Sequence, residues 1–281
     1  MSEQQYRPSS FSVLPLVVKN LLILNGLFFL AAWAFKNQYE IDLTNYLGLH
    51  YYSSQYFRPY QFITYMFMHG GVDHIFFNMF ALWMFGNVLE NFWGPKRFLI
   101  FYMVTGIGAA LIYMSYQAFQ FYRIDQSVQA LINNPVPEEY YSLIKKYFSS
   151  YLEIGQNQVQ IDAFVDHWSL DLNNKLYLQH ALTDINQLVS FQQDNPVIGA
   201  SGAIFGVLLA FGMLFPNTLL YVYFLIPIKA KYFVIFYGAL ELYSGILNNP
   251  GDNVAHFAHL GGMLFGFILI KYWQKKNKHF Y

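Results

Sequence analysis

Apolar positions along this chain fall into long uncharged stretches rather than into the narrow stripes of a soluble helix. Residues 20–35, 98–122 and 195–228 contain no Asp, Glu, Lys or Arg, and Asp73 is the single charge between residues 59 and 89. Surface helices of soluble proteins carry charged side chains on one face at every turn. A helix that crosses a bilayer instead needs ~20 predominantly apolar residues. The pattern therefore predicts a polytopic membrane protein.

Turn-forming residues divide the apolar stretches into six expected spans. Gly94 and Pro95 separate the second from the third, Pro216 and Pro227 follow the fourth, and a cluster of Asn, Pro and Gly at 248–253 separates the last two. Proline ends a helix because it lacks the N–H donor. The predicted fold class is an all-α bundle whose spans are residues 14–35, 72–93, 98–121, 199–215, 231–247 and 254–273.

Composition supports a membrane protein and excludes several function classes. Apolar residues make up 56% of the chain and charged residues only 11%, against about 25% charged in a typical soluble domain. There is no Cys, which excludes thiol nucleophiles and thiolate metal sites. The 16 basic and 16 acidic residues cancel, so no basic surface is available for nucleic acid. The lipid bilayer is the expected environment.

The distribution of Lys and Arg predicts the orientation in the membrane. Six spans place both termini on one side, and basic residues concentrate on the cytoplasmic side. With cytoplasmic termini, ten basic residues lie inside and six outside. Residues 1–12 lack the layout of a cleaved signal peptide, so the first span is expected to remain as an anchor. We expect a multi-pass protein of the plasma (inner) membrane.

One segment of the chain is polar and interrupts the spans. Residues 123–194 hold 13 of the 32 charges, and helical periodicity follows Pro137 and, more weakly, residues 176–190. It could gate substrate access or simply pack its aromatic residues on the bilayer surface. We therefore expect the chain to have three parts. Residues 1–121 hold a cytoplasmic tail, spans one to three and the first outer loop, and residues 122–195 form an acidic helical insertion on the outer face. Residues 196–281 hold spans four to six, with the catalytic Ser and His, and a basic cytoplasmic tail.

Polar side chains inside spans are costly and therefore mark function. His74 and Asn78 lie four residues apart at the start of the second span, so both can donate a hydrogen bond toward one point. Asp73 is expected to cap that helix. Ser201, between small residues, opens the fourth span at the same outer depth. There, helix-initial N–H groups can stabilise a developing oxyanion.

A serine nucleophile needs a base, and the candidates at that depth are the histidines that open the sixth span. No Asp or Glu is expected beside them, so the residues predict a Ser–His dyad without a third member. Two pairs of glycines four residues apart, Gly202 with Gly206 and Gly262 with Gly266, allow the fourth and sixth helices to cross closely. That crossing would bring Ser201 to a sixth-span histidine.

Three motifs together resemble the rhomboid family of intramembrane serine proteases, over roughly residues 14–121 and 196–273. They are the His-x4-His-x3-Asn run at 69, 74 and 78, the Gly-x-Ser-Gly at 199–202, and the Ala-His-x-x-Gly-x-x-x-Gly at 258–266. The resemblance implies Ser201 as nucleophile and His259 as base. It also implies His74, Asn78 and the Ser201 backbone N–H as oxyanion donors, with supporting roles for His69, Gly199, Gly202, Phe205, Gly262 and Gly266.

The chain departs from the family pattern in three places. Tyr60-Gln61 stands where the family often has Trp-Arg, and Arg58 lies three residues before Gln61. An arginine is therefore not expected to anchor the first outer loop in the way that is usual in the family. His256 is an additional imidazole that could compete with His259 for the role of base. The insertion at residues 122–195 is not part of the minimal family core.

The predicted function is a serine endopeptidase that cleaves transmembrane helices of membrane-protein substrates near the outer face of the bilayer, without cofactor or metal. Substrate is expected to enter past the fifth span and the 248–253 loop. The alternative is a catalytically silent, rhomboid-like chaperone that binds client helices. A metal held by the four histidines at 69, 74, 256 and 259 is disfavoured because the His-Glu-x-x-His pattern is absent. Glu241, inside the fifth span, is expected to be neutral or hydrogen-bonded to a neighbouring helix.

Overall fold

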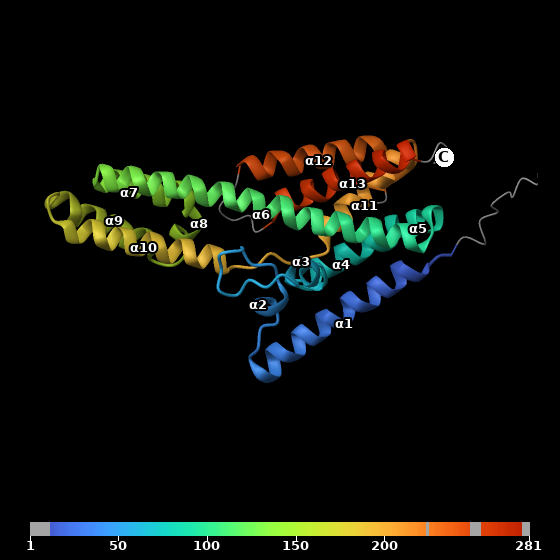
Figure 1. Cartoon of the computed structure of the whole chain (residues 1–281), viewed down its shortest axis with the longest axis horizontal. Coiled ribbons are helices and arrows are strands. Elements are labelled where there is room, and N and C mark those ends of the chain that lie inside the picture. The colour runs from blue at the N-terminus through green and yellow to red at the C-terminus, as the bar shows by residue number, and fades with distance from the viewer. Residues whose placement is uncertain (1–11, 223–224, 248–253, 277–281) are drawn as a thin grey trace, which may run out of the picture.

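The computed structural model describes residues 12–222, 225–247 and 254–276. Its helices form a bundle at one end of the long axis and a smaller helical group at the other, and α6 runs through both (Figure 1). Three helical stretches in the described ranges are long and apolar enough to cross a membrane. They are α1 (Leu16–Tyr39), the continuous run of α4 (Val72–Ala81), the π-helical segment η2 (Leu82–Gly86) and α5 (Asn87–Trp93), and α6 (Pro95–Asn133).

Helices also occupy the other three expected spans. They are α11 (Ser201–Leu214), α12 (Ala230–Leu247) and α13 (His256–Lys276), which lie with α6 in the bundle (Figure 1). Helix α11 has 14 residues, or ~21 Å at 1.5 Å per residue, and is shorter than the ~30 Å hydrocarbon core. Each of the six spans expected from the sequence therefore contains a helix. Only three of these helical stretches are long and apolar enough to be identified as membrane spans, so the six-span count stays a prediction.

The first turn of helix α1 is held to the bundle by a buried glutamate of α5. Its N-terminal residue is preceded by Pro15, whose side chain cannot cap a helix. The Glu90 carboxylate of α5 accepts hydrogen bonds from the backbone N–H groups of Val17 and Val18, both at 2.8 Å. A carboxylate at a helix N-terminus satisfies unpaired donors and complements the helix dipole. Glu90 therefore fixes where α1 meets α5.

Glycine determines how closely α11 and α13 approach, as the spacing of the glycine pairs predicted. A Cβ at Gly262 would overlap the carbonyl oxygen of Gly202, and one at Gly206 would lie 2.6 Å from Thr105 of α6. A Cβ at Gly266 would lie 3.3 Å from the Gly206 backbone. The two helices thus touch backbone to backbone, which fixes the relative position of their N-terminal ends.

Replacing Gly262 by Ala should destabilise the protein strongly. The added methyl group meets a backbone oxygen that cannot rotate away, so the cost should reach ~3 kcal/mol or more, the upper end for overpacking. We expect the melting temperature in detergent to fall by about 5–10 °C. Gly26→Ala on α1 is the matched control, because a Cβ there meets nothing within 4 Å. Equal melting temperatures for the two variants would contradict the backbone contact.

The polar segment forms its own helical core. Helix α6 continues past the expected end of the third span at residue 121, because no Pro interrupts it before Pro135. Four helices follow, namely α7 (Pro137–Tyr147), α8 (Ser149–Leu152), α9 (Asn157–Leu170) and α10 (Lys175–Asp194). Tyr140, Ile144 and Trp168 are buried between them. The insertion is therefore a packed unit that shares α6 with the bundle.

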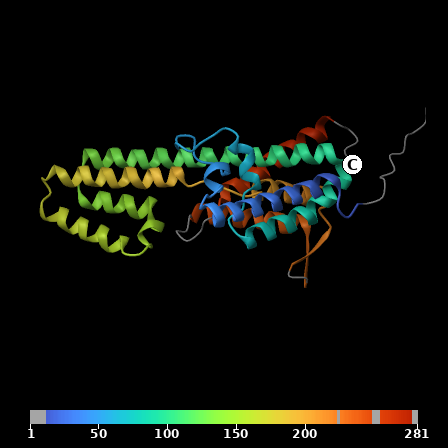
Figure 2. The same cartoon turned by 90° about the horizontal axis from the view of Figure 1, so that it is seen from below.

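The all-α prediction is wrong in one place. Strands β1 (Leu219–Val222) and β2 (Ile226–Lys229) pair in antiparallel register, with Leu219 opposite Lys229. Figure 2 shows this hairpin projecting from the helices. The prolines at 216 and 227 end helical structure here, and the intervening β-branched and aromatic residues favour strands once a helix is excluded.

The loop between α1 and α4 contains three short helices, α2 (Thr44–Leu47), α3 (Gln61–Thr64) and η1 (Tyr65–Phe67). It is joined to the segment that precedes Ser201. Leu49 and Val197 form an antiparallel bridge, and the Gly199 N–H donates to the Tyr65 carbonyl at 2.9 Å. The loop thus sets the position of residues 197–199, which lead directly into α11.

Candidate active site

The N-terminal ends of α11 and α13 bring Ser201 and His259 together. The Ser201 Oγ lies 2.8 Å from Nε2 of His259. The His259 ring stacks on Phe205, one turn after Ser201, with centroids 4.1 Å apart and an interplanar angle of 7°. Stacking and the hydrogen bond restrict the imidazole to one orientation. The pair that the sequence predicted is thus assembled in hydrogen-bond contact.

A third group completes this contact and corrects the expectation that no carboxylate lies beside the histidines. Glu241, on α12, is only 6% exposed. Its Oε2 lies 2.8 Å from Nδ1 of His259 and 2.7 Å from Nδ1 of His256. The arrangement is Ser–His–Glu rather than an isolated dyad. Residue spacing within one helix could not indicate this contact, because Glu241 and His259 lie on different helices.

The carboxylate also assigns the tautomer of His259. An ionised carboxylate only accepts hydrogen bonds, so the Nδ1 atom that faces it carries the proton. The neutral ring then has its lone pair on Nε2, the atom that faces Ser201. This is the tautomer that a general base requires. His256 contacts the same carboxylate oxygen, with its ring centroid 6.4 Å from that of His259.

Metal binding is the competing chemistry for this cluster. The ligand atoms of Glu241, His256 and His259 all lie within 4.8 Å of one another. Two imidazoles and a carboxylate are also a known ligand set for catalytic zinc. In the structure the ligand atoms hydrogen-bond each other directly, at distances shorter than the separation between two ligands of one zinc ion. The geometry therefore fits a proton-transfer network without rearrangement.

His74, on α4, is oriented toward the space beside the Ser201 hydroxyl. The Gly70 N–H donates to its Nδ1 at 3.3 Å, so the neutral ring carries its proton on Nε2. A Cβ built on Gly199 would lie 2.8 Å from that Nε2 and 3.6 Å from the Ser201 Oγ. Gly199 has a φ of +125°, so glycine permits both the backbone conformation and the approach of His74. A donor therefore faces the space beside the serine.

Asn78 and Asp73 behave differently from His74. The Asn78 side chain is buried and donates one amide N–H to the His74 carbonyl at 2.9 Å, which leaves one N–H for another acceptor. The capping prediction for Asp73 is wrong. Gly71 is the N-cap of α4, and Asp73 lies in the first turn without a capping hydrogen bond. Its charge there still complements the helix dipole.

The backbone supplies further donors next to Ser201. Helix α11 begins at Ser201, and the first N–H groups of a helix have no acceptor within it. They point along the helix axis toward the N-terminal end, where negative charge is favoured. The Ser201 N–H and His74 Nε2 thus both face the neighbourhood of the serine hydroxyl.

Gln61 anchors the loop between α1 and α4, at the place where the family often has an arginine. Its buried side chain accepts from the N–H groups of His50 and Arg58 and donates to the carbonyls of Tyr46 and Tyr56. Arg58 itself is exposed at its guanidinium, which bonds carbonyls of its own loop. All four hydrogen-bonding positions of the Gln61 amide are therefore used within the loop.

His69 supports the site from the same loop. Its buried ring packs edge-on against His74, with centroids 5.0 Å apart. Burial, and then the neighbouring His74 ring, lower the pKa of His69 to about 4, so this imidazole is neutral at pH 7. An uncharged ring beside His74 preserves the proton arrangement described above.

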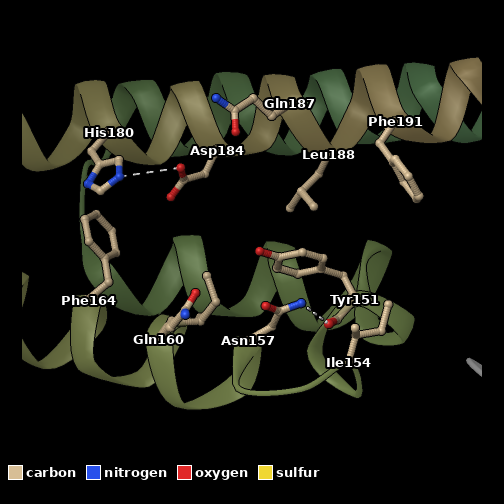
Figure 3. A pocket seen from close by; sticks show the side chains of 11 residues that line it. Tyr151, Ile154, Asn157, Gln160, Phe164, His180, Asp184, Gln187, Leu188 and Phe191 are labelled. Carbon is tan, nitrogen blue, oxygen red and sulfur yellow. Dashed lines mark hydrogen bonds and ion pairs between the residues drawn. The ribbon is translucent and has the colours of Figure 1, made fainter.

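A separate cavity of about 560 Å³ lies in the insertion between α9 and α10. Figure 3 shows aromatic and aliphatic walls, including Phe164, Leu188 and Phe191, with His180 and Asp184 paired at 3.5 Å at one end. None of the candidate active-site residues lines it. The proposed chemistry therefore belongs to the helix bundle and not to this cavity.

Comparison with known proteins identifies related sequences. The family model described as "Rhomboid domain" matches residues 56–122 and 175–275, more than half of the chain, and leaves residues 123–174 unmatched. "RHOMBOID-like protein 12, mitochondrial" of Arabidopsis thaliana is 22% identical over 205 residues, which cover 73% of this chain and 44% of that protein. "Rhomboid protease GluP" of Bacillus subtilis (strain 168) is 37% identical over 49 residues, which cover 17% of this chain and 10% of that protein. The matched part is thus less than half the length of either relative.

Proposed function

Because this chain belongs to the rhomboid family and is an integral membrane protein, we propose that it is an intramembrane serine endopeptidase. The observation that carries the proposal is the 2.8 Å contact between Ser201 Oγ and His259 Nε2. Its substrates would be transmembrane helices of other membrane proteins. No cofactor is required for this chemistry.

The proposed reaction is acyl transfer to Ser201. The Ser201 Oγ attacks the carbonyl carbon of the scissile peptide while its proton moves to Nε2 of His259. Collapse of the tetrahedral intermediate breaks the C–N bond, and the proton passes to the leaving nitrogen. Water then repeats the sequence on the acyl-enzyme. His74 Nε2 and the Ser201 N–H would stabilise the oxyanion, with Asn78 contributing its remaining N–H.

The membrane arrangement proposed is six spans with both termini in the cytoplasm of a plasma-membrane protein. Two contacts support placing the N-terminal and C-terminal ends of the described residues on the same side of the membrane, because both ends contact α5. Ser12 hydrogen-bonds Asn91 at 3.0 Å, and Trp273 packs on Trp93 with centroids 5.5 Å apart. The short helix α11 then leaves Ser201 below the outer membrane surface. The plant relative is named as mitochondrial, and which membrane holds this chain is part of the proposal.

Substrate entry is proposed to occur past α12. A transmembrane helix must fray before its peptide bonds can be attacked, because helical carbonyls are hydrogen-bonded and shielded. Substrates with helix-weakening residues near the outer surface should therefore be preferred. The expected role of the loop at residues 248–253 lies outside the described residues.

Covalent labelling tests the proposal directly. A fluorophosphonate probe should label the purified protein, because it reacts with serines activated by a base. Ser201→Ala should abolish labelling and His259→Ala should reduce it to background, with both variants folded in detergent. A catalytically silent client-binding protein would give no labelling of the wild-type chain. That result would reject the protease and favour the chaperone.

A further inference from the structure

We propose that Glu241 is a positioning residue that completes a Ser201–His259–Glu241 triad inside the membrane. The inference rests on the proposed protease function and adds a residue that the sequence motifs do not contain. Glu241 touches neither the serine nor the expected substrate position. It acts through the imidazole that lies between them.

The geometry carries the proposal. Three helices contribute one member each, with α11 supplying Ser201, α13 His259 and α12 Glu241. The two hydrogen bonds in series are both 2.8 Å, and the outer two members attach to opposite nitrogens of one ring. Glu241 and His259 are 6% and 7% exposed. A buried carboxylate is costly unless it is paired and hydrogen-bonded, and this one faces the histidine that faces the serine.

The carboxylate has two consequences for the reaction. It keeps the Nδ1 proton of His259 in place, so that Nε2 accepts the proton of Ser201. It also stabilises the imidazolium that forms when that proton arrives. The Nδ1 proton stays on the ring throughout, and Glu241 remains ionised. Electrostatic stabilisation of this kind is stronger in a low-dielectric site than in water.

His256 supports the carboxylate rather than the serine. Its Nδ1 donates to the same Oε2 that accepts from His259, so two N–H groups hold one oxygen. A second donor fixes the carboxylate and offsets part of its desolvation. Because Glu241 lies on α12, the position of that helix determines whether His259 is oriented. Movement of α12 would separate the carboxylate from the base.

Kinetics of a Glu241→Gln variant test the assignment. We expect kcat for a reporter transmembrane helix to fall about 10²–10⁴-fold, as when a triad carboxylate is replaced by its amide, with KM little changed. The fluorophosphonate labelling rate should fall in parallel. Glu241→Asp should restore part of kcat, because it keeps the charge. His256→Ala removes one of the two donors to the Glu241 carboxylate but leaves the Glu241–His259 contact, so kcat should fall by less than in Glu241→Gln.

Glu90→Gln is the matched control. Glu90 is also buried and also accepts two hydrogen bonds of 2.8 Å, but from the backbone of α1 and not from a histidine of the candidate site. Its replacement should lower the melting temperature without changing kcat of the folded protein. If Glu241→Gln behaved like Glu90→Gln, Glu241 would be structural and the triad would be rejected. Loss of wild-type activity in a chelator, restored by zinc alone, would also overturn it, because Glu241 would then be a ligand.

The same assays separate the two proposals. Absence of Ser201-dependent labelling in the wild-type protein would reject the protease itself. Labelling of the wild type that is equally fast in Glu241→Gln would leave the protease standing and reject only the triad.

Discussion

If the proposed function holds, replacing Ser201 by Ala is expected to abolish cleavage of a reporter transmembrane helix, with kcat reduced by ~10⁴–10⁶-fold as in known serine proteases. Without the hydroxyl no acyl-enzyme can form, and the positioned imidazole has no proton to accept. The Ser201 Oγ is in direct contact with His259, so removal of either group should be equally severe. Cleavage is measured on gels, with the Ser201→Ala or wild-type protein and the reporter protein reconstituted together in liposomes.

The neighbouring histidine provides the control for this prediction. His256→Ala removes an imidazole from the same turn of α13 but leaves the Ser201–His259 contact in place. It should cleave the reporter more slowly than the wild type, because Glu241 loses one donor, whereas His259→Ala should not cleave it. Cleavage by Ser201→Ala, or loss in His256→Ala with retention in His259→Ala, would contradict the assigned nucleophile or base.

The motif residues could be located from the sequence because their signals are local. His74 and Asn78 share a helix face, and Ser201 with Phe205 lie one turn apart. The glycine pairs predicted the crossing of α11 and α13, because only a side chain without Cβ permits backbone contact. Such patterns fix which residues line a helix surface. They do not fix the rotation of one helix against another.

Glu241 shows where this reasoning stopped and which signal could have extended it. Residues 248–253 connect α12 to α13 along the chain. Glu241 precedes this segment by about as many residues as His259 follows it. At 1.5 Å per helical residue, both would lie ~10 Å along their helices from this segment, so a similar depth in the bundle was predictable. A buried carboxylate in a span needs a partner. The facing side chain, however, depends on helix rotation, which packing sets.

The limits of the third span illustrate a different error. Charge marks where the chain leaves an apolar environment, and residue 123 begins the charged segment. A helix ends where its hydrogen bonding is interrupted, and α6 continues to Asn133, just before Pro135. The two boundaries differ because a helix can pass from lipid into water unbroken. The hairpin at β1 and β2 was missed for a related reason, since apolar composition alone does not distinguish strand from helix.

The insertion is connected to the candidate active site through the chain that follows α10. Asp194 at the end of α10 accepts a hydrogen bond from the Ser54 hydroxyl at 2.6 Å. Three residues later Val197 pairs with Leu49, and Gly199 bonds Tyr65. The residues that lead into Ser201 are thus hydrogen-bonded to the loop between α1 and α4 on one side and continuous with the insertion on the other. This arrangement explains why the start of α11 is positioned without a capping side chain.

Replacing His74 by Ala is expected to lower kcat by ~10²–10³-fold while KM changes little, the usual cost of one oxyanion-hole donor. The reason is geometric. The Gly70 N–H holds Nδ1 of His74, which places the proton on Nε2, and that atom approaches Gly199 beside the serine. Asn78→Ala should cost less, because one of its N–H groups is already committed to the His74 carbonyl. Reporter cleavage and the rate of fluorophosphonate labelling measure both effects. Unchanged kcat in His74→Ala, with a melting temperature equal to wild type, would show that the oxyanion is held by backbone N–H groups alone.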